Sequence, residues 1–401
     1  MKPSENQTKI EQNIYKNLLG KIDPRAIGLI KYLREHGFRG YLVGGAIRDL
    51  LNDDVPRDFD IVTEARPEQV AKLFAPMARI VGRRFRLVHV CYEKKIFEVS
   101  TLRKGTASYR HRDGNGLICS DNDYGSSIKV DSNRRDITIN SIYYDPLTNK
   151  IFDYVGGAED FAKKIIRVIG DPSKRFLEDP IRILRVYRFA ARLGFTVESK
   201  TQNVLERLIS EIHLISPIRL YGHILKDLSS GYSYRFFQNL GNEGILNYLW
   251  PALYEELGIL REEHDCLLEV VLKNNDERIR KGLPISATLF FAVFLWTLLE
   301  KRMAPEKSCY WRKEKLENIA TEIIKEASKV VAIPKFLKDS ISRIWQLQID
   351  LEKEKRGKIE EDRHFRTGYH LFRIRSKNAP DLLSALNCWT RIYKLQGRSA
   401  K

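Results

Sequence analysis

Short runs of apolar, β-branched and aromatic residues recur through the first 160 residues of the chain. Five of them have the length and composition of strands and are bounded by turn residues: YLVG, DFDIVT, IFEVSTL, SIYYD and IFDYVG. Helical patterns lie between them, as at 67–74, where apolar residues recur every three or four positions. This mixture predicts an N-terminal domain of α/β or α+β type, built around a β-sheet.

The pattern changes near Asp179. From there to Lys401 apolar residues recur at helical spacing and strand signals largely vanish. The clearest helix is DPIRILRVYRFAARLGF, in which Asp179 suits the N-cap, Pro180 the first helical position and Gly194 the end. We therefore expect a multidomain α+β protein, with an N-terminal mixed sheet and helices followed by an all-helical remainder.

One stretch shows neither periodicity. Between Lys104 and Asn133 the residues are mostly Gly, Ser, Asn, Asp, Arg and His. A polar segment of this length inside a domain is usually a functional loop, so we predict a long mobile loop here.

Composition supports packed, globular domains. The chain has 401 residues, of which 43% are hydrophobic and 30% charged, enough for two to four domains. The longest apolar stretch, 287–299, is too short to span a membrane and suits a buried helix. The N-terminus lacks the apolar core of a signal peptide, and the five cysteines form no CxxC pair. We expect no membrane insertion and a cytoplasmic location.

Charge indicates the kind of partner. The formal net charge is +17, and the last 71 residues hold 16 Lys and Arg against 8 Asp and Glu. A surplus of this size favours a polyanion such as nucleic acid, although a merely solvated basic surface is the alternative.

A glycine turn is the first candidate for chemistry. The strand YLV leads into Gly44 and Gly45, which permit positive φ and close approach of the backbone to a phosphate. The residues after them, 46–51, are predicted to begin a helix, whose first N–H groups point at an anion. Arg48 offers a charge-assisted hydrogen bond at the same place.

Two aspartates follow the turn. Asp58 and Asp60 flank a phenylalanine in the strand-like run DFDIVT, so both carboxylates are expected on one face, roughly 7 Å apart at the backbone. Such a pair repels itself without a cation, and Mg²⁺, or Mn²⁺ in its place, prefers these ligands and shares them with substrate phosphates. Either motif alone is common in turns and loops, but together they predict a nucleoside triphosphate site with two metal ions.

Further carboxylates and cations lie downstream. Two residues are candidates for the third carboxylate at the metals: Glu98, in IFEVSTLR, and Asp136, in RRDITIN. The sequence does not decide between them. Arg135 beside Asp136 suits triphosphate or ribose binding, and Asn140 offers an amide to a sugar hydroxyl. The alternative for RRD is a surface salt-bridge cluster.

The helix after Asp179 carries arginines at spacings of three, three and four, which form one basic stripe: Arg182, Arg185, Arg188 and Arg192. Asp179 and Arg182 permit a sharper hypothesis. Adenine presents an N6 donor beside an N1 acceptor, and a carboxylate with a guanidinium can meet both. Cytosine presents the same order, whereas guanine and uracil present the opposite one and would leave these groups unpaired.

Taken together, GGAIRD, DFDIVT, RRDITINSIYYD and EDPIRILRVYRFAARLGF resemble the motifs of the class II nucleotidyltransferases, which comprise bacterial poly(A) polymerases and CCA-adding enzymes. The resemblance spans about residues 40 to 195. It implies a catalytic head followed by a helical neck, body and tail, which we expect at 1–165, 166–230, 231–310 and 311–401. The last of these would be a basic RNA-binding region.

The resemblance also implies an activity, the Mg²⁺-dependent transfer of a nucleoside monophosphate to an RNA 3′ end. Carried over by motif, the metal ligands would be Asp58 and Asp60, with Asp136 or Glu98 as the third acidic position. The nucleotide-binding residues would be Gly44, Gly45, Arg48, Arg135, Asn140, Asp179, Arg182, Arg185 and Arg188.

Two features bear on the choice within the family. The segment IVGRRFRLVHV, at 80–90, and AIPKFLKDSISRIWQLQ, at 332–348, look like segments of bacterial poly(A) polymerases. The leading hypothesis is therefore the addition of AMP from ATP to RNA 3′ ends. A CCA-adding enzyme is the alternative, and an RNA-binding protein without catalysis is the alternative of another class. The pair His264 and Asp265 is interpreted as structural, not as part of a phosphohydrolase site.

Overall fold

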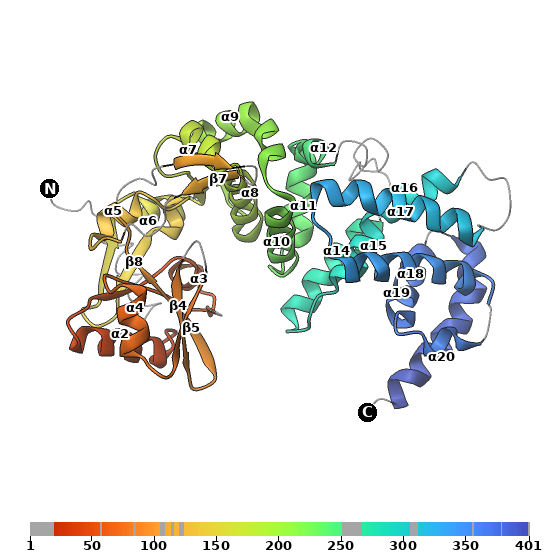
Figure 1. The fold of residues 1–401 in the computed structure, drawn as a ribbon, viewed down its shortest axis with the longest axis horizontal. Coiled ribbons are helices and arrows are strands. Elements are labelled where there is room, and N and C mark those ends of the chain that lie inside the picture. The colour runs from red at the N-terminus through yellow and green to blue at the C-terminus, as the bar shows by residue number, and fades with distance from the viewer. Residues whose placement is uncertain are drawn as a thin grey trace. The chain divides into compact units, whose positions relative to one another are not determined.

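The computed structural model describes residues 20–56, 58–82, 86–104, 109–113, 116–119, 124–250, 267–304, 312–354, 357–377 and 379–399. The chain divides into two compact units, Met1–Ala190 with Gly194–Leu208, and Ala191–Leu193 with Ile209–Lys401 (Figure 1). The finer division into head, neck, body and tail stays a prediction.

The first unit is built on a seven-stranded mixed sheet with the strand order β3-β4-β5-β2-β1-β8-β9. Its strands are β1 (Gly40–Val43), β2 (Asp60–Thr63), β3 (Ala78–Val81), β4 (Leu87–Tyr92), β5 (Lys95–Thr101), β8 (Ile142–Asp145) and β9 (Lys150–Asp153). Neighbouring strands are antiparallel except β2 and β5, which are parallel. All five runs predicted as strands lie in this sheet, although β2 begins only at Asp60, two residues later than the pattern suggested.

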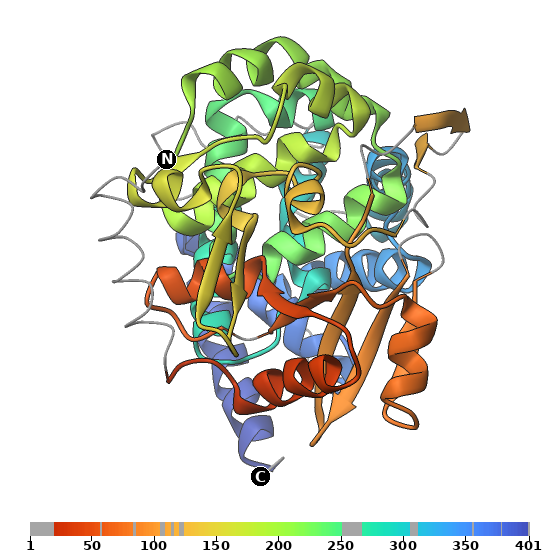
Figure 2. The ribbon, with the colours of Figure 1, turned by 90° about the vertical axis from the view of Figure 1, so that its left-hand side faces the viewer.

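Three helices pack on one face of the sheet, namely α2 (Pro24–Glu35), α3 (Gly45–Leu51) and α4 (Pro67–Leu73). Figure 2 shows α2 in red and α4 in orange beside the strands. Asp23 starts α2 by accepting a hydrogen bond from the backbone N–H of Arg25, and Pro24 occupies the first position. The spacing of Ala26, Ile30 and Leu33 puts these buried side chains on one stripe, which packs against the strands.

The opposite face of the sheet carries a smaller apolar cluster. It joins Tyr41 and Val43 of β1 to Val62 of β2 and Tyr143 of β8, and Ile128 of α5 (Ile128–Ser132) packs on it. Because side chains alternate along a strand, Asp60 points to the same face as Val62. This face therefore combines a small core with polar side chains.

The remainder of the first unit is mainly helical. Its elements are η1 (Thr138–Asn140), α6 (Gly157–Ala162), β10 (Ile165–Ile166), α7 (Pro172–Glu178), α8 (Ile181–Leu193), β11 (Thr196–Val197) and α9 (Ser199–Leu208). The predicted arginine-rich helix is α8. It begins one residue after the expected position, with Pro180 as its N-cap, and ends at Gly194, whose φ of 68° gives the left-handed C-cap.

The expectation of a long loop at 104–133 is wrong for part of that stretch. A two-stranded hairpin, β6 (Tyr109–Asp113) and β7 (Gly116–Cys119), and the helix α5 lie within it. This hairpin pairs through its backbone and lacks the apolar alternation that marks a half-buried strand, so the pattern did not reveal it. Residues 105–108, 114–115 and 120–123 lie outside the described residues.

The regular elements among the described residues of the second unit are all helices. This agrees with the helical remainder predicted from Asp179 onward, apart from the two-residue strand β11 in the first unit. Its elements are η2 (Ile209–Leu214), α10 (Pro217–Leu228), α11 (Ser233–Asn242), α12 (Ile245–Leu249), α14 (Leu267–Arg280), α15 (Ala287–Phe294), α16 (Trp296–Met303), α17 (Lys313–Val330), α18 (Lys335–Glu352), η3 (Lys358–Glu361), α19 (Phe365–Arg375), η4 (Pro380–Leu382) and α20 (Leu383–Ser399). The apolar stretch at 287–299 forms α15 and the start of α16, both largely buried. Among the described helices, none is long and apolar enough to cross a membrane.

Candidate active site

The glycine turn joins β1 to α3 beside the polar face of the sheet. Gly44 has φ 76° and ψ −129°, a conformation that only glycine adopts without strain. A Cβ atom built on Gly44 would lie 3.4 Å from Oδ2 of Asp60 and 3.7 Å from Nη1 of Arg135. Gly45 differs, because its φ is not positive and its Cβ would meet only the Nη2 atom of Arg48, at 3.5 Å. The turn therefore needs glycine at 44, where the backbone approaches a carboxylate and a guanidinium.

Five residues form a row across the sheet, one from each of five adjacent strands. The register pairs Tyr143 with Val43, Val43 with Asp60, Asp60 with Glu98, and Glu98 with His89. All five lie on the face opposite α2, since their strand neighbours Ile61, Phe97 and Val88 belong to the core beneath. Nε2 of His89 lies 3.5 Å from Oε1 of Glu98. The row thus sets Asp60 directly beside Glu98, close to the glycine turn.

The electrostatics of Asp60 reflect this crowding. Burial, and then the negative charges of Glu98 and Asp58, raise its pKa to about 6, against a partial opposing effect of Arg135 and Arg48. The negative charges of Glu98 and Asp58 therefore repel the charge of Asp60, so ionising Asp60 costs free energy. A cation bound among them would remove that cost.

Arg135 is held over Tyr143. Its Nε donates to the Tyr143 hydroxyl at 2.9 Å and to Oδ2 of Asp131 at 3.4 Å, and its guanidinium carbon lies 5.1 Å from the ring centroid. The Tyr143 hydroxyl in turn donates to Asp131 at 2.6 Å. Burial and Asp131 raise the pKa of Tyr143, so the phenol stays protonated and donates. This arrangement holds Nη1 of Arg135 beside Gly44 and Asp60.

Arg48 and Asn140, both predicted to contact the nucleotide, bind each other inside the unit. Arg48 is only 2% exposed, and its Nη1 donates to Oδ1 of Asn140 at 2.9 Å. Its Nε and Nη2 donate to Oδ1 of Asp49, and its guanidinium lies over the ring of Phe189. The geometry favours a structural tie between α3 and the RRDITIN segment over a direct contact of Arg48 with a triphosphate.

Asp136 lies in a different network from Asp58 and Asp60. Its Oδ1 accepts from Nε of Arg182 at 3.0 Å, and its Oδ2 is 2.6 Å from Nη1 of Arg185. Although burial acts to raise the pKa of Asp136, Arg185, Arg182 and Arg175 together hold it below its ordinary value. Asp136 is therefore an ionised anchor for the arginine stripe of α8.

The same network extends to α7. Nη1 of Arg182 donates to the backbone oxygen of Arg175 and to Oε2 of Glu178. Nη2 of Arg175 donates to the backbone oxygens of Arg134 and Arg135. Asp179 lies between α7 and α8, and its Oδ1 accepts weakly from the N–H of Ile181, at 3.4 Å. Arg182, at 11% side-chain exposure, is thus packed and oriented, not a freely solvated member of a basic surface.

Several of these supporting residues were not anticipated: Asp49, Asp131, Tyr143, Arg175 and Glu178. Tyr143 lies in a run that was predicted as a strand, but alternation alone does not say which face meets Asp60. Of the earlier candidates, Arg188 is half-buried on α8. Arg83, Arg84 and Phe85 of the segment IVGRRFRLVHV, and the pair His264 and Asp265, lie outside the described residues.

Comparisons with known proteins agree along the chain. Residues 40–167 match the family model "Poly A polymerase head domain", residues 194–257 match "Probable RNA and SrmB- binding site of polymerase A", and residues 312–401 match "Polymerase A arginine-rich C-terminus". Poly(A) polymerase I of Escherichia coli O6:H1 is 38% identical over 371 residues, which cover 89% of this chain and 79% of that protein.

CCA-adding enzymes are similar over less of the sequence. The enzyme of Lactobacillus helveticus is 36% identical over 216 residues, covering 53% of this chain and 52% of that protein. Among solved structures, the Bacillus stearothermophilus CCA-adding enzyme in complex with CTP has a TM-score of 0.52 and 27% identity, covering 82% of this chain and 84% of that one. The sequence similarity to poly(A) polymerase I therefore covers more of the chain than the similarity to this CCA-adding enzyme, and the solved CCA-adding enzyme shares the fold.

Proposed function

Because the chain belongs to the bacterial poly(A) polymerase family and is thus a polynucleotide adenylyltransferase, we propose that it transfers AMP from ATP to RNA 3′ ends at Asp58, Asp60 and Glu98, beside Gly44. The observation that carries this assignment is the position of Asp60 beside Glu98 and near Asp58. Burial, and then the negative charges of Glu98 and Asp58, raise the pKa of Asp60 to about 6. The RNA 3′ oxygen forms a bond to the α-phosphorus of ATP, the bond between that phosphorus and the α–β bridging oxygen breaks, and pyrophosphate leaves.

The carboxylates suit Mg²⁺. Their oxygens are the ligands that this ion prefers, and their mutual repulsion is what a divalent cation relieves. Among the described residues, no three His, Cys, Asp or Glu side chains already enclose a metal site, but Mg²⁺ usually completes its shell with waters and substrate phosphates. When bound, the ions lower the pKa of the attacking hydroxyl and neutralise charge on the leaving group. Mn²⁺ is the expected substitute.

For the third acidic position the geometry favours Glu98 over Asp136. Glu98 is the register partner of Asp60, and its side chain is 53% exposed, so it can turn toward a shared cation. Asp136 is largely buried and forms ion pairs with Arg182 and Arg185. We assign Asp136 to holding the arginines of α8 in place.

The roles assigned to Glu98 and Asp136 predict different effects when each residue is substituted. Glu98→Gln is expected to lower kcat at least tenfold and raise the Mg²⁺ concentration needed for half-maximal activity, with little change in melting temperature. Asp136→Asn should instead destabilise the protein by about 2 kcal/mol, because it removes the anion that largely buried Arg182 and partly exposed Arg185 share, and leaves Arg182 to pair with Glu178. Mg²⁺ titrations and thermal melts of both variants check this. Reversed phenotypes would return the metal role to Asp136.

Base selection is assigned to Asp179 and Arg182. Arg182 is oriented by Asp136 and by Glu178, and such a fixed donor can recognise adenine N1 while a carboxylate accepts from N6. Arg135, held over Tyr143 beside Gly44, is positioned for a phosphate or the ribose. We assign Arg48 and Asn140 to supporting the turn. The cytoplasm, where ATP and RNA are present together, stays the expected compartment.

The reaction is tested with purified protein, Mg²⁺ and a generic RNA, offered each nucleoside triphosphate in turn, alongside tRNA that lacks its terminal CCA. Long tails from ATP alone are expected. Incorporation of CTP that stops after completion of CCA on tRNA would identify a CCA-adding enzyme instead. RNA binding without incorporation of any nucleotide would indicate a non-catalytic protein.

A further inference from the structure

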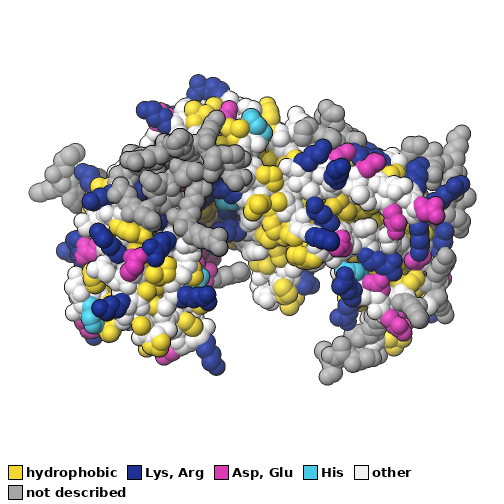
Figure 3. Space-filling view, viewed as in Figure 1, with side chains coloured by type: hydrophobic (Ala, Val, Ile, Leu, Met, Phe, Trp, Pro, Cys, Tyr) yellow, Lys and Arg dark blue, Asp and Glu magenta, His cyan; other side chains and the backbone are white. Residues whose placement is uncertain are grey.

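A basic cavity lies within the second unit, far along the sequence from the residues of the candidate active site. Its volume is about 600 Å³, and helices α14, α15, α19 and α20 line it. Four of its lining side chains are cationic, Arg278, Lys281, Arg366 and Arg373, and His370 and Tyr393 lie among them. Figure 3 shows Lys and Arg side chains over the visible face of this unit, interspersed with hydrophobic ones.

The cations come from two helices. Arg366 and Arg373 lie seven residues apart on α19, with His370 between them, so all three share one face of that helix. Arg278 lies in the last turn of α14, where its Nε and Nη2 donate to the backbone oxygen of Pro284. The one acidic residue among the lining, Glu277, pairs with Lys281 at 2.5 Å. Three arginine charges therefore remain in excess at the cavity.

Aromatic rings complete the lining. The guanidinium of Arg366 lies over the ring of Tyr393 at 5.6 Å, and Tyr393 stacks on Tyr369 with centroids 4.5 Å apart. The Tyr393 hydroxyl hydrogen-bonds to Nε2 of His370, at 3.1 Å. Burial, and then Arg373, Arg278 and Arg366, lower the pKa of His370 to about 4, which reports the positive field in this cavity.

We propose that this cavity binds the sugar–phosphate backbone of the RNA strand, a site that rests on the polyadenylation function but is distinct from the AMP-transfer site. Two helical turns separate Arg366 from Arg373, about 10 Å along the axis. That separation matches successive phosphates of one strand better than a single phosphate. Contacts of this kind hold the strand without reading its bases, as an enzyme that extends RNA ends of any sequence requires.

The test removes the two α19 arginines together. For Arg366→Ala with Arg373→Ala, the affinity for a fluorescent single-stranded oligoadenylate should fall roughly tenfold. The slope of log affinity against log salt should become shallower by about 1.4, the amount expected for two phosphate contacts to a single strand. KM for ATP and kcat at saturating RNA should stay within about twofold of the wild type. That retained chemistry separates this proposal from the proposed function, which fails if the wild type transfers no AMP or only completes CCA on tRNA.

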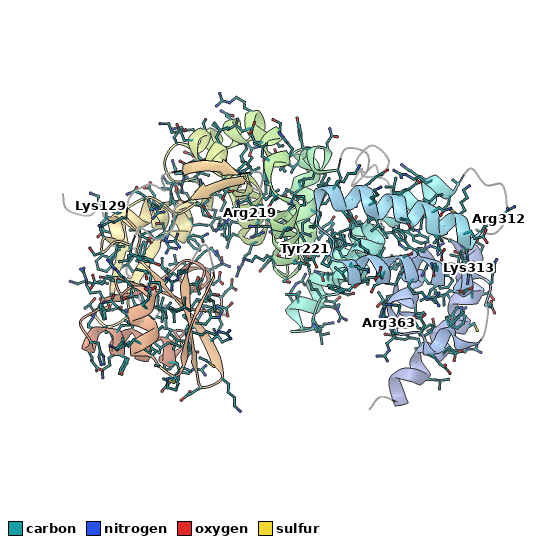
Figure 4. The ribbon with its side chains drawn as sticks, viewed as in Figure 1. Lys129, Arg219, Tyr221, Arg312, Lys313 and Arg363 are labelled. Atoms are coloured by element: carbon teal, nitrogen blue, oxygen red, sulfur yellow. The ribbon has the colours of Figure 1, made fainter. Side chains whose placement is uncertain are left out.

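A matched control removes two arginines of the same unit that do not line the cavity. Arg312 and Arg363, both labelled in Figure 4, are exposed, and Arg312→Ala with Arg363→Ala should leave the affinity within about threefold. Arg366→Lys with Arg373→Lys keeps the charge and should retain most of the affinity even if the alanine variant folds poorly. An equal loss in the control, or a loss in the lysine variant as large as in the alanine variant, overturns the proposal. A raised KM for ATP with unchanged RNA affinity also overturns the proposal and would indicate that the cavity binds a free nucleotide. No effect of the alanine variant on either quantity overturns it too, and would indicate that the cavity binds an acidic protein segment.

Discussion

Replacing Asp60 by Asn is expected to abolish AMP transfer while RNA affinity stays near the wild-type value. Asp60 is the carboxylate that Gly44, Arg135 and Glu98 surround, and an amide neither binds a divalent cation with comparable strength nor carries the charge that holds it there. Loss of at least a thousandfold in kcat is expected, because charge stabilisation is the main contribution that a protein makes to phosphoryl and nucleotidyl transfer. Single-turnover transfer assays and RNA binding curves measure the two effects separately.

The same variant should be more stable than the wild type when no metal is present. The pKa of Asp60 is raised to about 6 in the folded protein, from an ordinary value of 3.8. Between these values the folded state holds a proton that the unfolded state has released, so the free energy of unfolding of the wild type decreases as the pH rises through this window. Asp60→Asn removes that loss, and in EDTA at pH 8 it should gain up to about 3 kcal/mol, with little gain at pH 4.

Thermal melts with and without Mg²⁺ complete this test. Mg²⁺ should raise the melting temperature of the wild type more than that of Asp60→Asn, since a ligand stabilises only the state that binds it. Asp54→Asn, at an exposed position just after α3, serves as the control and should behave as the wild type. Normal turnover by Asp60→Asn and by Asp58→Ala would rule out the metal assignment.

Gly44→Ala is expected to reduce transfer at least a hundredfold and to destabilise the protein by about 2 kcal/mol. The backbone at Gly44 has φ 76° and ψ −129°, which an alanine adopts only with strain. The added methyl group would also lie in van der Waals contact with Oδ2 of Asp60, at 3.4 Å, and Nη1 of Arg135, at 3.7 Å, the groups that we assign to the metal and the nucleotide. Steady-state kinetics and chemical denaturation measure the two losses.

The neighbouring glycine provides the matched control. Gly45 lies at the start of α3 without a positive φ, and a methyl group there meets only the end of the Arg48 side chain. Gly45→Ala should therefore keep its stability and remain within about fivefold of wild-type activity. Equal losses in both variants would show that the strain at Gly44 is not what the site depends on.

Much of the fold and the centre of the site could be predicted from local pattern. The five strand-like runs, the helices after the glycine turn and at 67–74, and the end of α8 at Gly194 follow from periodicity and backbone preferences, which act over a few residues. The hairpin within 104–133 was missed because its strands carry no apolar alternation. Both glycines of the turn permit a positive φ, and the pattern did not say which of them adopts it; Gly44 does, and α3 begins at Gly45.

The sequence alone determined the fold class, the pairing of a glycine turn with Asp58 and Asp60, and the family to which the chain belongs, because these depend on residue types at short, constant spacings. Only the tertiary structure decided which distant residues join them. Strand order and register set Glu98 beside Asp60, whereas the packing of α8 set Asp136 against Arg182 and Arg185. The packing of α3 against η1 placed Arg48 against Asn140. By residue type alone, Glu98 and Asp136 are equally good candidates for a metal ligand. Burying a charged group costs free energy, and this cost arises only when the helices and strands pack together. It is why the largely buried Asp136 pairs with arginines, whereas the more exposed Glu98 is placed to bind a metal ion.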